Sequence, residues 1–288
     1  MARRIMKIAC TLSLALLALS MGCGRHPLVY DSIHEAAAKG NLADVKRHIQ
    51  RGAAINARDE YGKTPLMNAC EHSSSKVVIY LVDSGADINL WDKTGKTPVI
   101  YAALSGNKSL LEYLVQQDAS VISKDQEGMT PLMYAAQRGE HEAVYFLVNK
   151  GADIHAADNN GMTALMYASS RGDMNVITFL VDRGADVNAA DKRGDTALSR
   201  VVMTSYNSEM AEYLISHGAY VDTIDNDGIT PLLCAVMFDK LDMVKLLVNN
   251  GANIHKKCKG GMTPYKYSDL GIRDDILNYF NELQSPIN

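Results

Sequence analysis

Apolar and polar positions follow a pattern along the chain that repeats every 33 residues. A phrase of the form Gly-x-Thr-Pro or Gly-x-Thr-Ala, followed by apolar residues, occurs seven times, with one step of 34 residues among the steps of 33. These phrases begin at Gly62, Gly95, Gly128, Gly161, Gly194, Gly228 and Gly261. Internal repeats of this length predict stacked supersecondary units rather than one closed core.

Each repeat predicts a helix, a turn, a second helix and a hairpin-like loop. Thr130 is placed to cap the first helix, and Pro131 suits the first helical position because no N–H is needed there. Gly139 suits the turn between the helices, and Gly151 ends the second helix with a left-handed residue. The second helix carries an apolar stripe that no unit can bury alone, so stability is expected to come from stacking on neighbouring units.

These residues resemble a known family. The stretch from Asp125 to Asp158 matches the pattern Asp-x-x-Gly-x-Thr-Pro-Leu-His-x-Ala-Ala, then Gly, Val-x-x-Leu-Leu and Gly-Ala-Asp, which is typical of the ankyrin repeat. The resemblance implies an all-α solenoid of about seven to eight helix-turn-helix units joined by hairpin-like loops, with capping units at both ends. The expected repeat domain covers residues 31–283, with units at about 31–59, 60–92, 93–125, 126–158, 159–191, 192–225, 226–258 and 259–283, and a C-terminal tail at 284–288.

Two features depart from the family pattern. The His that the family places after Leu is kept only as His34, which leaves open how the other units replace the hydrogen bond it usually makes between units. The unit at 192–225 has the unusual run Ser199-Arg200-Val201-Val202 and one extra residue near 204–208. This unit is predicted to be either the weakest point of the array or a place shaped for a partner.

The start of the chain predicts a secretory signal peptide at residues 1–22. Arg3, Arg4 and Lys7 precede an apolar run from Ile8 to Met21. A basic start followed by an apolar stretch and small residues is typical of a signal peptide. The run is shorter than the roughly 20 residues that a transmembrane helix needs.

The residues after the apolar run resemble the lipobox of bacterial lipoproteins. Leu19-Ser20-Met21-Gly22-Cys23 carries this resemblance, with Ser20 in the place usually taken by Leu. The resemblance implies cleavage before Cys23, lipidation of Cys23 and a short tether at 23–30 that holds the solenoid to an envelope membrane, in the periplasm or facing the surface. A plainly secreted or soluble periplasmic protein, and an uncleaved anchor or a false signal, are the alternatives.

Charge and cysteine usage narrow the classes of partner. The chain has 29 Lys and Arg against 33 Asp and Glu, and the loss of three basic residues with the signal leaves 26 against 33, a net charge of −7. A mildly acidic surface argues against nucleic acid as the partner. Cys70, Cys234 and Cys258 have no metal-binding spacing; Cys70 is expected to be a buried thiol, and a Cys234–Cys258 disulfide is an open alternative.

Apparent catalytic motifs are explained by the repeat. Gly62-Lys63-Thr64 lacks the earlier glycine of a phosphate-binding loop, because Ala57 stands there. His141-Glu142 lacks the second His of a zinc-protease helix, because Tyr145 occupies that place. We therefore expect no enzyme activity, catalytic residue, metal, cofactor or small-molecule substrate.

The family resemblance implies that a partner meets the hairpin tips and the exposed side of the first helices. Trp91 is the only tryptophan and falls at a tip, where it is either a binding hot spot or a cover for a neighbouring hairpin. Tyr101, Tyr134 and Tyr167 share one repeat position and form either an aromatic ladder for a partner or packing between units. The candidate contact residues are Tyr61, Trp91, Lys93, Tyr101, Met129, Tyr134, Arg138, Tyr167, Arg171, Arg193 and Phe238.

The expected function is protein–protein binding through the concave face and hairpin tips of a membrane-tethered envelope protein. An inhibitor or immunity partner of a toxin or envelope enzyme, and a surface scaffold or adhesin, are the alternatives. The fold alone does not select among these functions.

Overall fold

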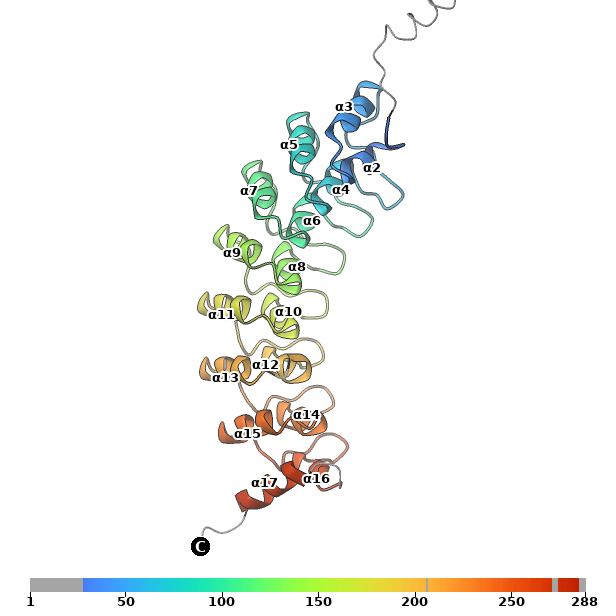
Figure 1. Cartoon of the computed structure of the whole chain (residues 1–288). Helices are drawn as coiled ribbons and strands as arrows, with labels where there is room; N and C mark the ends of the chain where they lie inside the picture. The colour runs from blue at the N-terminus through green and yellow to red at the C-terminus, as the bar shows by residue number, and fades with distance from the viewer. Residues whose placement is uncertain (1–27, 206, 271–273, 285–288) are drawn as a thin grey trace, which may run out of the picture.

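The computed structural model describes residues 28–205, 207–270 and 274–284. Within these residues, sixteen α-helices and one short π-helix form eight antiparallel pairs stacked in a single bent column (Figure 1). Apart from one isolated bridge between Ala157 and Thr163, these residues form no β-structure. The predicted all-α solenoid is therefore confirmed. The predicted signal peptide, lipidated Cys23 and residues 285–288 lie outside the described residues.

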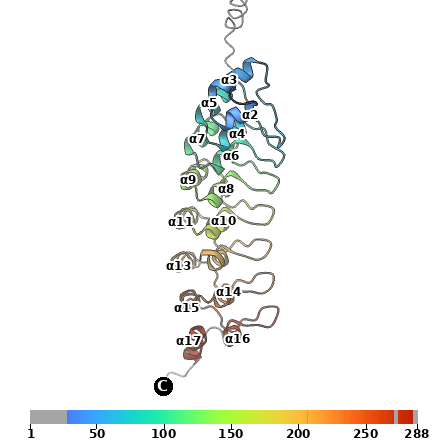
Figure 2. The same ribbon diagram turned by 45° about the vertical axis from the view of Figure 1, so that its right-hand side comes forward.

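The two helices of each pair lie on different sides of the column. The first helices lie beside the hairpin loops and the second helices lie along the opposite, convex edge, as Figures 1 and 2 both show. The first helices are α2 (Ile33–Ala38), α4 (Pro65–Glu71), α6 (Pro98–Leu104), α8 (Pro131–Arg138), α10 (Ala164–Arg171), α12 (Ala197–Arg200), α14 (Pro231–Met237) and α16 (Pro264–Ser268). The second helices are α3 (Leu42–Gln50), α5 (Ser75–Asp83), α7 (Lys108–Gln116), α9 (His141–Asn149), α11 (Met174–Asp182), α13 (Ser208–Ser216), α15 (Leu241–Asn249) and α17 (Asp274–Gln284).

Threonine begins most first helices, as the sequence predicts. The Thr130 hydroxyl accepts the backbone N–H of Met133 at 3.3 Å, and Pro131 follows at the first helical position. Thr97 is the exception, because its hydroxyl lies 3.2 Å from the Ser123 hydroxyl and makes no cap bond. The same kind of cap bond is made by Thr64, Thr163, Thr196, Thr230 and Thr263.

The repeat position at which the family usually has His is occupied by His34 in the first unit and by methionine in several others. His34 Nε2 donates to the carbonyl of Ala57 at 2.9 Å, a bond from the first helix to the following hairpin. In place of such a bond, the Sδ of Met133 accepts the backbone N–H of Thr130 at 3.4 Å. Met67 makes the same contact with Thr64, so Met67 and Met133 each close the start of their own helix.

A continuous apolar core runs the length of the column. Buried side chains extend from Ile33 in the first unit to Phe280 in the last, and leucines such as Leu66, Leu132 and Leu165 are almost fully covered. Full burial of one such leucine contributes about 1.5–3 kcal/mol relative to exposure. Because each helix pair covers the apolar stripe of its neighbour, the fold is stabilised by stacking.

Residues of α3 bind the backbone of the residues that precede the first helix. The backbone N–H groups of Val29 and Tyr30 both donate to Oδ2 of Asp44, at 2.7 and 3.0 Å. Burial opposes ionisation of Asp44, but these bonds and the Arg47 guanidinium hold its pKa below the ordinary value. His48 Nε2 donates to the Tyr30 carbonyl at 3.0 Å. The first described residues of the chain are thus held against α3.

The unit at 192–225 absorbs its extra residue in a wider helical turn. α12 continues directly into a π-helix at Val201–Ser205, labelled η1, before α13 begins. The hydroxyls of Thr204 and Ser205 donate to the carbonyls of Arg200 and Val201, at 2.7 and 3.1 Å. A π-turn is the usual way to accommodate one inserted residue without breaking a helix, and such turns are frequent at functional sites.

Candidate protein-binding surfaces

Each of the first six hairpins is closed by the carboxylate of its loop aspartate. At Asp125, Oδ1 accepts the backbone N–H groups of Glu127 at 3.0 Å and Met129 at 2.9 Å, and Oδ2 accepts the Tyr134 hydroxyl at 2.6 Å. The same pair of backbone bonds is made by Asp59, Asp92, Asp158, Asp191 and Asp225. These carboxylates are therefore structural groups, satisfied within their own hairpins.

Successive hairpins are joined by one backbone hydrogen bond at each junction. The N–H of Lys93 donates to the Tyr61 carbonyl at 3.0 Å, and the N–H of Gln126 donates to the Thr94 carbonyl at 2.9 Å. The equivalent bond is donated by Asn159, Lys192, Asn226 and Lys259. Because the hairpins form one ladder, the side chains at their tips are ordered before any partner arrives, which lowers the cost of binding.

The column of tyrosines lies below the surface. Tyr101 is 4% exposed and Tyr134 is 7% exposed, whereas Tyr167 is half-buried. Each hydroxyl donates to the loop aspartate nine residues earlier, at 2.5 to 2.6 Å. Burial and this carboxylate together raise the pKa of all three phenols. The interpretation as packing between units therefore holds for Tyr101 and Tyr134, and their predicted contact with a partner is corrected. Met129, predicted at a tip, is likewise buried.

Lysines of one unit lie over the tyrosine rings of the next, a feature that sequence reasoning missed. Lys63 Nζ is 4.6 Å from the ring centroid of Tyr101, and Lys96 Nζ is 5.5 Å from that of Tyr134. Lys63 also pairs with Glu71 at 2.7 Å. These cation–π contacts hold the lysines in place at the edge of the groove. The sequence pattern that predicts this contact is a Lys four residues after one loop aspartate, such as Lys63, and a Tyr nine residues after the next, such as Tyr101.

A cavity of about 400 Å³ opens on the groove side of the hairpins, between their tips and the ends of α4 and α6. Its walls include Tyr61, Lys93, Thr94 and Leu104, together with the anchored Lys96. Tyr61 is 62% exposed, and Lys93 is exposed with no ion-pair partner among the described residues. These two predicted contact residues are therefore brought together on the concave side.

Trp91 lines a different cavity, of about 640 Å³, formed by the hairpin arms and the loop that follows α7. Its side chain is 59% exposed, which leaves more than half of its surface open to solvent. Lys124, Asp118 and Ser120 share this cavity, whereas Tyr61 and Lys93 do not. The hairpin row thus presents two separate surfaces, whereas the sequence analysis placed Tyr61, Trp91 and Lys93 together.

The remaining predicted contact residues are exposed but dispersed. Arg138 and Arg171 end α8 and α10, Arg193 lies at a tip, and Phe238 follows α14 with 45% of its surface exposed. A Cβ at Gly139 would lie 2.3 Å from Nε of Arg171, so the glycine makes room for that guanidinium. The structure therefore places Arg171 across the turn that follows Arg138.

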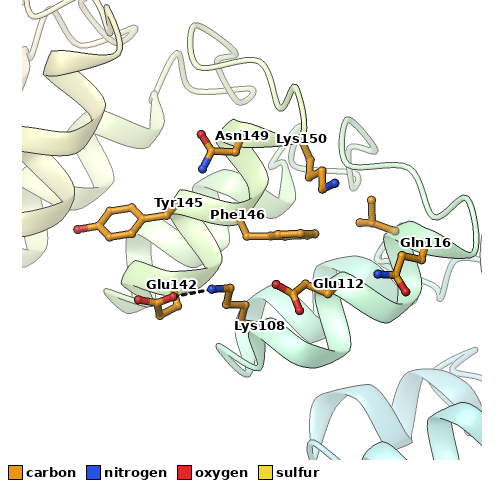
Figure 3. A pocket seen from close by; sticks show the side chains of 9 residues that line it. Lys108, Glu112, Gln116, Glu142, Tyr145, Phe146, Asn149 and Lys150 are labelled. Atoms are coloured by element: carbon orange, nitrogen blue, oxygen red, sulfur yellow. Dashed lines mark hydrogen bonds and ion pairs between the residues drawn. The ribbon is translucent and has the colours of Figure 1, made fainter.

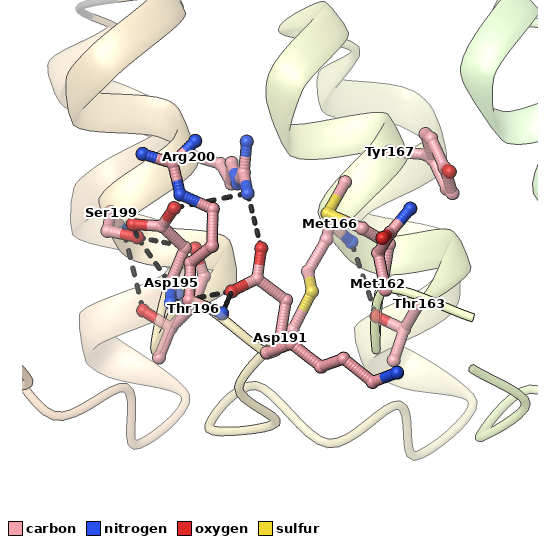
Figure 4. Close-up of polar contacts among 12 residues, drawn as sticks. Met162, Thr163, Met166, Tyr167, Asp191, Asp195, Thr196, Ser199 and Arg200 are labelled. Atoms are coloured by element: carbon pink, nitrogen blue, oxygen red, sulfur yellow. Dashed lines mark hydrogen bonds and ion pairs between the residues drawn. The ribbon is translucent and has the colours of Figure 1, made fainter. Parts of the chain in front are cut away.

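An ion-pair network replaces the tyrosine in the unit at 192–225. Arg200 stands at the repeat position of Tyr167 and pairs with the loop residue Asp191 and, at 3.1 Å, with Asp195 (Figure 4). Ser199 donates to Asp195 Oδ1 at 3.2 Å. Both carboxylates are buried, and Nε of Arg200 is a buried donor without a partner among the described residues. The network is structural, because one guanidinium holds two buried carboxylates.

The convex edge carries a cleft of about 580 Å³ between α7 and α9 (Figure 3). Lys108 and Glu142 form an ion pair of 3.0 Å across it, which raises the pKa of Lys108. Lys150 Nζ lies 5.7 Å from the ring centroid of Phe146. One ion pair thus crosses the cleft, whereas the Lys150–Phe146 contact lies on the α9 side alone.

The described residues hold no cluster of three or more His, Cys, Asp or Glu that could bind a metal. Cys70, Cys234 and Cys258 are free thiols in the structure, and burial raises the pKa of the Cys234 thiol to about 12. Across 28–205, 207–270 and 274–284, the helices lack the length and apolar character that a membrane crossing needs.

Known proteins resemble parts of this array. The chain is 42% identical over 57 residues to Protein phosphatase 1 regulatory subunit 27 of Homo sapiens, which is 20% of this chain and 37% of that protein. It is 37% identical over 59 residues to an ankyrin repeat protein of Monkeypox virus, 20% of this chain and 10% of that protein. A probable E3 ubiquitin-protein ligase of Oryza sativa subsp. japonica is 44% identical over 50 residues, 17% of this chain and 10% of that protein.

This chain spans less than two fifths of the length of each of these relatives. What they share with it is the repeat. The family described as "Ankyrin repeats (3 copies)" matches residues 33–125, 120–191 and 184–258. Together these segments cover most of the chain, and repeats of this family typically serve as protein-binding scaffolds. The chain belongs to the ankyrin-repeat family.

Proposed function

We propose that this solenoid binds a segment of another protein in its concave groove, without catalysing a reaction. The observation that carries the proposal is that exposed side chains stand on a rigid part of the backbone, at the cavity lined by Tyr61 and Lys93. The hairpin ladder and the Lys–Tyr contacts fix the groove, while Tyr61 and Lys93 stay exposed above a cavity of about 400 Å³. A preorganised surface with an exposed aromatic residue and a free cation is suited to protein recognition.

The proposal includes export and attachment to an envelope membrane through Cys23. Its support is the basic, apolar and small-residue order of the first 23 residues. Val29 and Tyr30 are held by Asp44 at the first unit. Six residues of extended chain reach at most about 20 Å, so lipidation of Cys23 would hold that unit close to the membrane.

Affinity capture of the anchored protein from native membranes tests the binding proposal. We expect one stoichiometric protein partner, and we expect its recovery to fall sharply with Tyr61→Ala and Lys93→Glu together. Tyr220→Ala is the matched control, because Tyr220 is 68% exposed on another unit and lines neither hairpin cavity. Undiminished recovery with the double variant would remove the groove from the proposal.

The attachment has its own test. Cys23→Ser should move the protein from the membrane fraction to the soluble fraction, with the fold unchanged by circular dichroism. A Cys23→Ser protein that stays in the membrane fraction would contradict lipidation at this residue.

A further inference from the structure

Trp91 lies between two cations in one column of the hairpin row. The residue before the loop aspartate is Arg58 in one hairpin, Trp91 in the next and Lys124 in the third. All three are exposed. The following two units have Ala157 and Ala190 at this position, so the cation–aromatic–cation run is confined to these three hairpins.

Contacts with the preceding hairpin hold Trp91 in place. Nη1 of Arg58 donates to the Trp91 carbonyl at 2.6 Å and to the Gly62 carbonyl at 3.0 Å. The neighbouring backbone bond from Lys93 to Tyr61 fixes the same hairpin. The indole is therefore exposed on a rigid backbone, as a residue that anchors a partner must be.

On its other side, Trp91 faces the cavity of about 640 Å³ that it shares with Lys124. Lys124 Nζ donates to the Ala157 carbonyl at 3.4 Å, which leaves its charge without a carboxylate partner among the described residues. The cavity also holds the polar side chains of Asn89, Ser120, Ser123 and Gln126. These groups suit the N–H and C=O groups of an extended chain, which are spaced along its whole length.

We propose that this column binds an extended segment of a partner protein in which an apolar side chain is flanked on both sides by acidic residues. The apolar side chain covers Trp91, and the two carboxylates face Arg58 and Lys124. The inference rests on the proposed function, that the solenoid binds a protein, but it uses a surface separate from the groove.

The spacing of the segment follows from the repeat. Neighbouring units are separated by about 8–10 Å, the usual distance between packed helices. An extended chain advances about 3.3 Å per residue, so one hairpin step corresponds to about three residues. The matching sequence is therefore acidic-x-x-apolar-x-x-acidic.

The Asp118 carboxylate opposes binding of the acidic side chain that faces Lys124. Asp118 lines the same cavity, and its φ of 65° places it in the left-handed region at a position where the other units have glycine. A carboxylate there repels the acidic residue that approaches Lys124. Asp118→Asn tolerates the same backbone and removes the charge, so it should tighten binding by about two- to fivefold.

Titration of the full chain, purified in mild detergent, with a synthetic peptide tests the inference. The peptide acetyl-Gly-Glu-Ser-Thr-Leu-Ser-Thr-Glu-Gly-amide should give a saturable change in tryptophan fluorescence, which reports on Trp91 alone because the chain has no other tryptophan. Peptides with Ser in place of Leu, or with Lys in place of both Glu, are the controls and should not saturate.

Variants locate the site when binding is followed by fluorescence anisotropy of a labelled peptide. Trp91→Ala should weaken binding at least about tenfold, because a central aromatic anchor carries most of the affinity. Lys124→Glu should weaken binding, and a peptide with Lys in place of the Glu that faces residue 124 should restore it. Lys257→Glu, at the same repeat position in the last hairpin, is the matched control and should leave binding unchanged.

Two results would overturn the inference. One is no saturable signal with the acidic peptide at about 1 mM; the other is equal binding by the Lys124→Glu variant. Either result leaves the groove proposal standing if capture of a native partner still depends on Tyr61 and Lys93. Loss of that dependence, with peptide binding intact, would instead leave the Trp91 surface as the binding site.

Discussion

Two kinds of unit differ in the side chain that binds the loop aspartate. The tyrosine units use Tyr101, Tyr134 or Tyr167, and the arginine unit uses Arg200. In both, a loop aspartate needs a donor from the first helix nine residues later. Tyr134 supplies a neutral hydroxyl to Asp125, whereas Arg200 supplies a charged group to Asp191 and also to Asp195. In the Tyr134 unit, hydrogen bonds hold the Asp125 carboxylate, and Lys96 of the preceding unit adds an ion pair at 3.7 Å. The arginine unit compensates two buried charges with one side chain.

The difference teaches where the array is sensitive to substitution. A phenol that is removed leaves a carboxylate still bound by two backbone N–H groups. A guanidinium that is removed leaves two buried carboxylates close together, in the unit that also contains the π-helix η1. The arginine unit is therefore expected to be the more vulnerable of the two.

Arg200→Ala should give the largest loss of stability, about 3–5 kcal/mol, because it breaks a buried ion pair and leaves Asp191 and Asp195 uncompensated. Urea unfolding followed by circular dichroism measures the change. The double variant Arg200→Ala with Asp195→Ala should recover part of the loss, because one of the two carboxylates is gone. A double variant that is as unstable as the single one would contradict the role of the charges.

Tyr134→Phe should cost about 1 kcal/mol, because one buried hydrogen bond is lost while the two backbone bonds to Asp125 remain. The same unfolding measurement applies. Tyr113→Phe is the control, since the Tyr113 hydroxyl donates to the exposed Asp83 and its loss should have less effect. Equal costs for the two variants would mean that burial of the Tyr–Asp bond adds nothing.

Acid should destabilise the tyrosine units in a predictable direction. Burial alone raises the pKa of Asp92, but hydrogen bonds from Tyr101, Thr94 and the Lys96 backbone more than offset it and hold the pKa below its ordinary value of 3.8. The ionised Asp92 carboxylate therefore stabilises the fold fully at pH values above its unfolded-state pKa. This stabilisation is lost as the pH falls through the lower pKa of the folded state.

Tyr101→Phe tests this direction, because it removes one of the bonds that lower the Asp92 pKa. The variant should lose less stability than the wild type when the pH falls from about 5 to about 2, a span that contains the ordinary aspartate pKa. Urea midpoints at each pH give the comparison. Parallel pH curves for the two proteins would contradict the coupling.

The smallest effect on stability is expected at the proposed binding residues. Tyr61→Ala and Trp91→Ala should each change the free energy of unfolding by no more than about 0.5 kcal/mol, because both side chains are largely exposed. Thermal unfolding checks this. A larger loss would show that the residue belongs to the structural network and would move it out of the binding surfaces.

Local chemistry made the fold predictable from the sequence. Thr130, Pro131 and Gly139 act through their own backbone neighbours, so their roles as cap, first helical residue and turn follow from residue type alone. The position of Trp91 at a hairpin tip also followed from the repeat, but the sequence left open whether its ring is exposed or covers a neighbouring hairpin.

Contacts between units were harder to predict. The repeat position of Tyr134 was clear, but only the packing of neighbouring units shows that its ring is covered and that Lys96 lies over it. The extra residue near 204–208 was also visible. Its accommodation as η1 depends on which backbone hydrogen bonds form, and residue type does not decide that.

The first unit and the last hairpin differ in the side-chain hydrogen bonds that hold their loops. The first unit is latched by Asp44, which holds the entering chain. The last hairpin has Cys258 where the others have aspartate, so it keeps its backbone bonds but lacks the carboxylate that braces the turn. In a one-dimensional stack, opening starts at the least braced unit and passes to its neighbours. We therefore expect the wild-type array to open first at the hairpin of Cys258 and last at the unit held by Asp44.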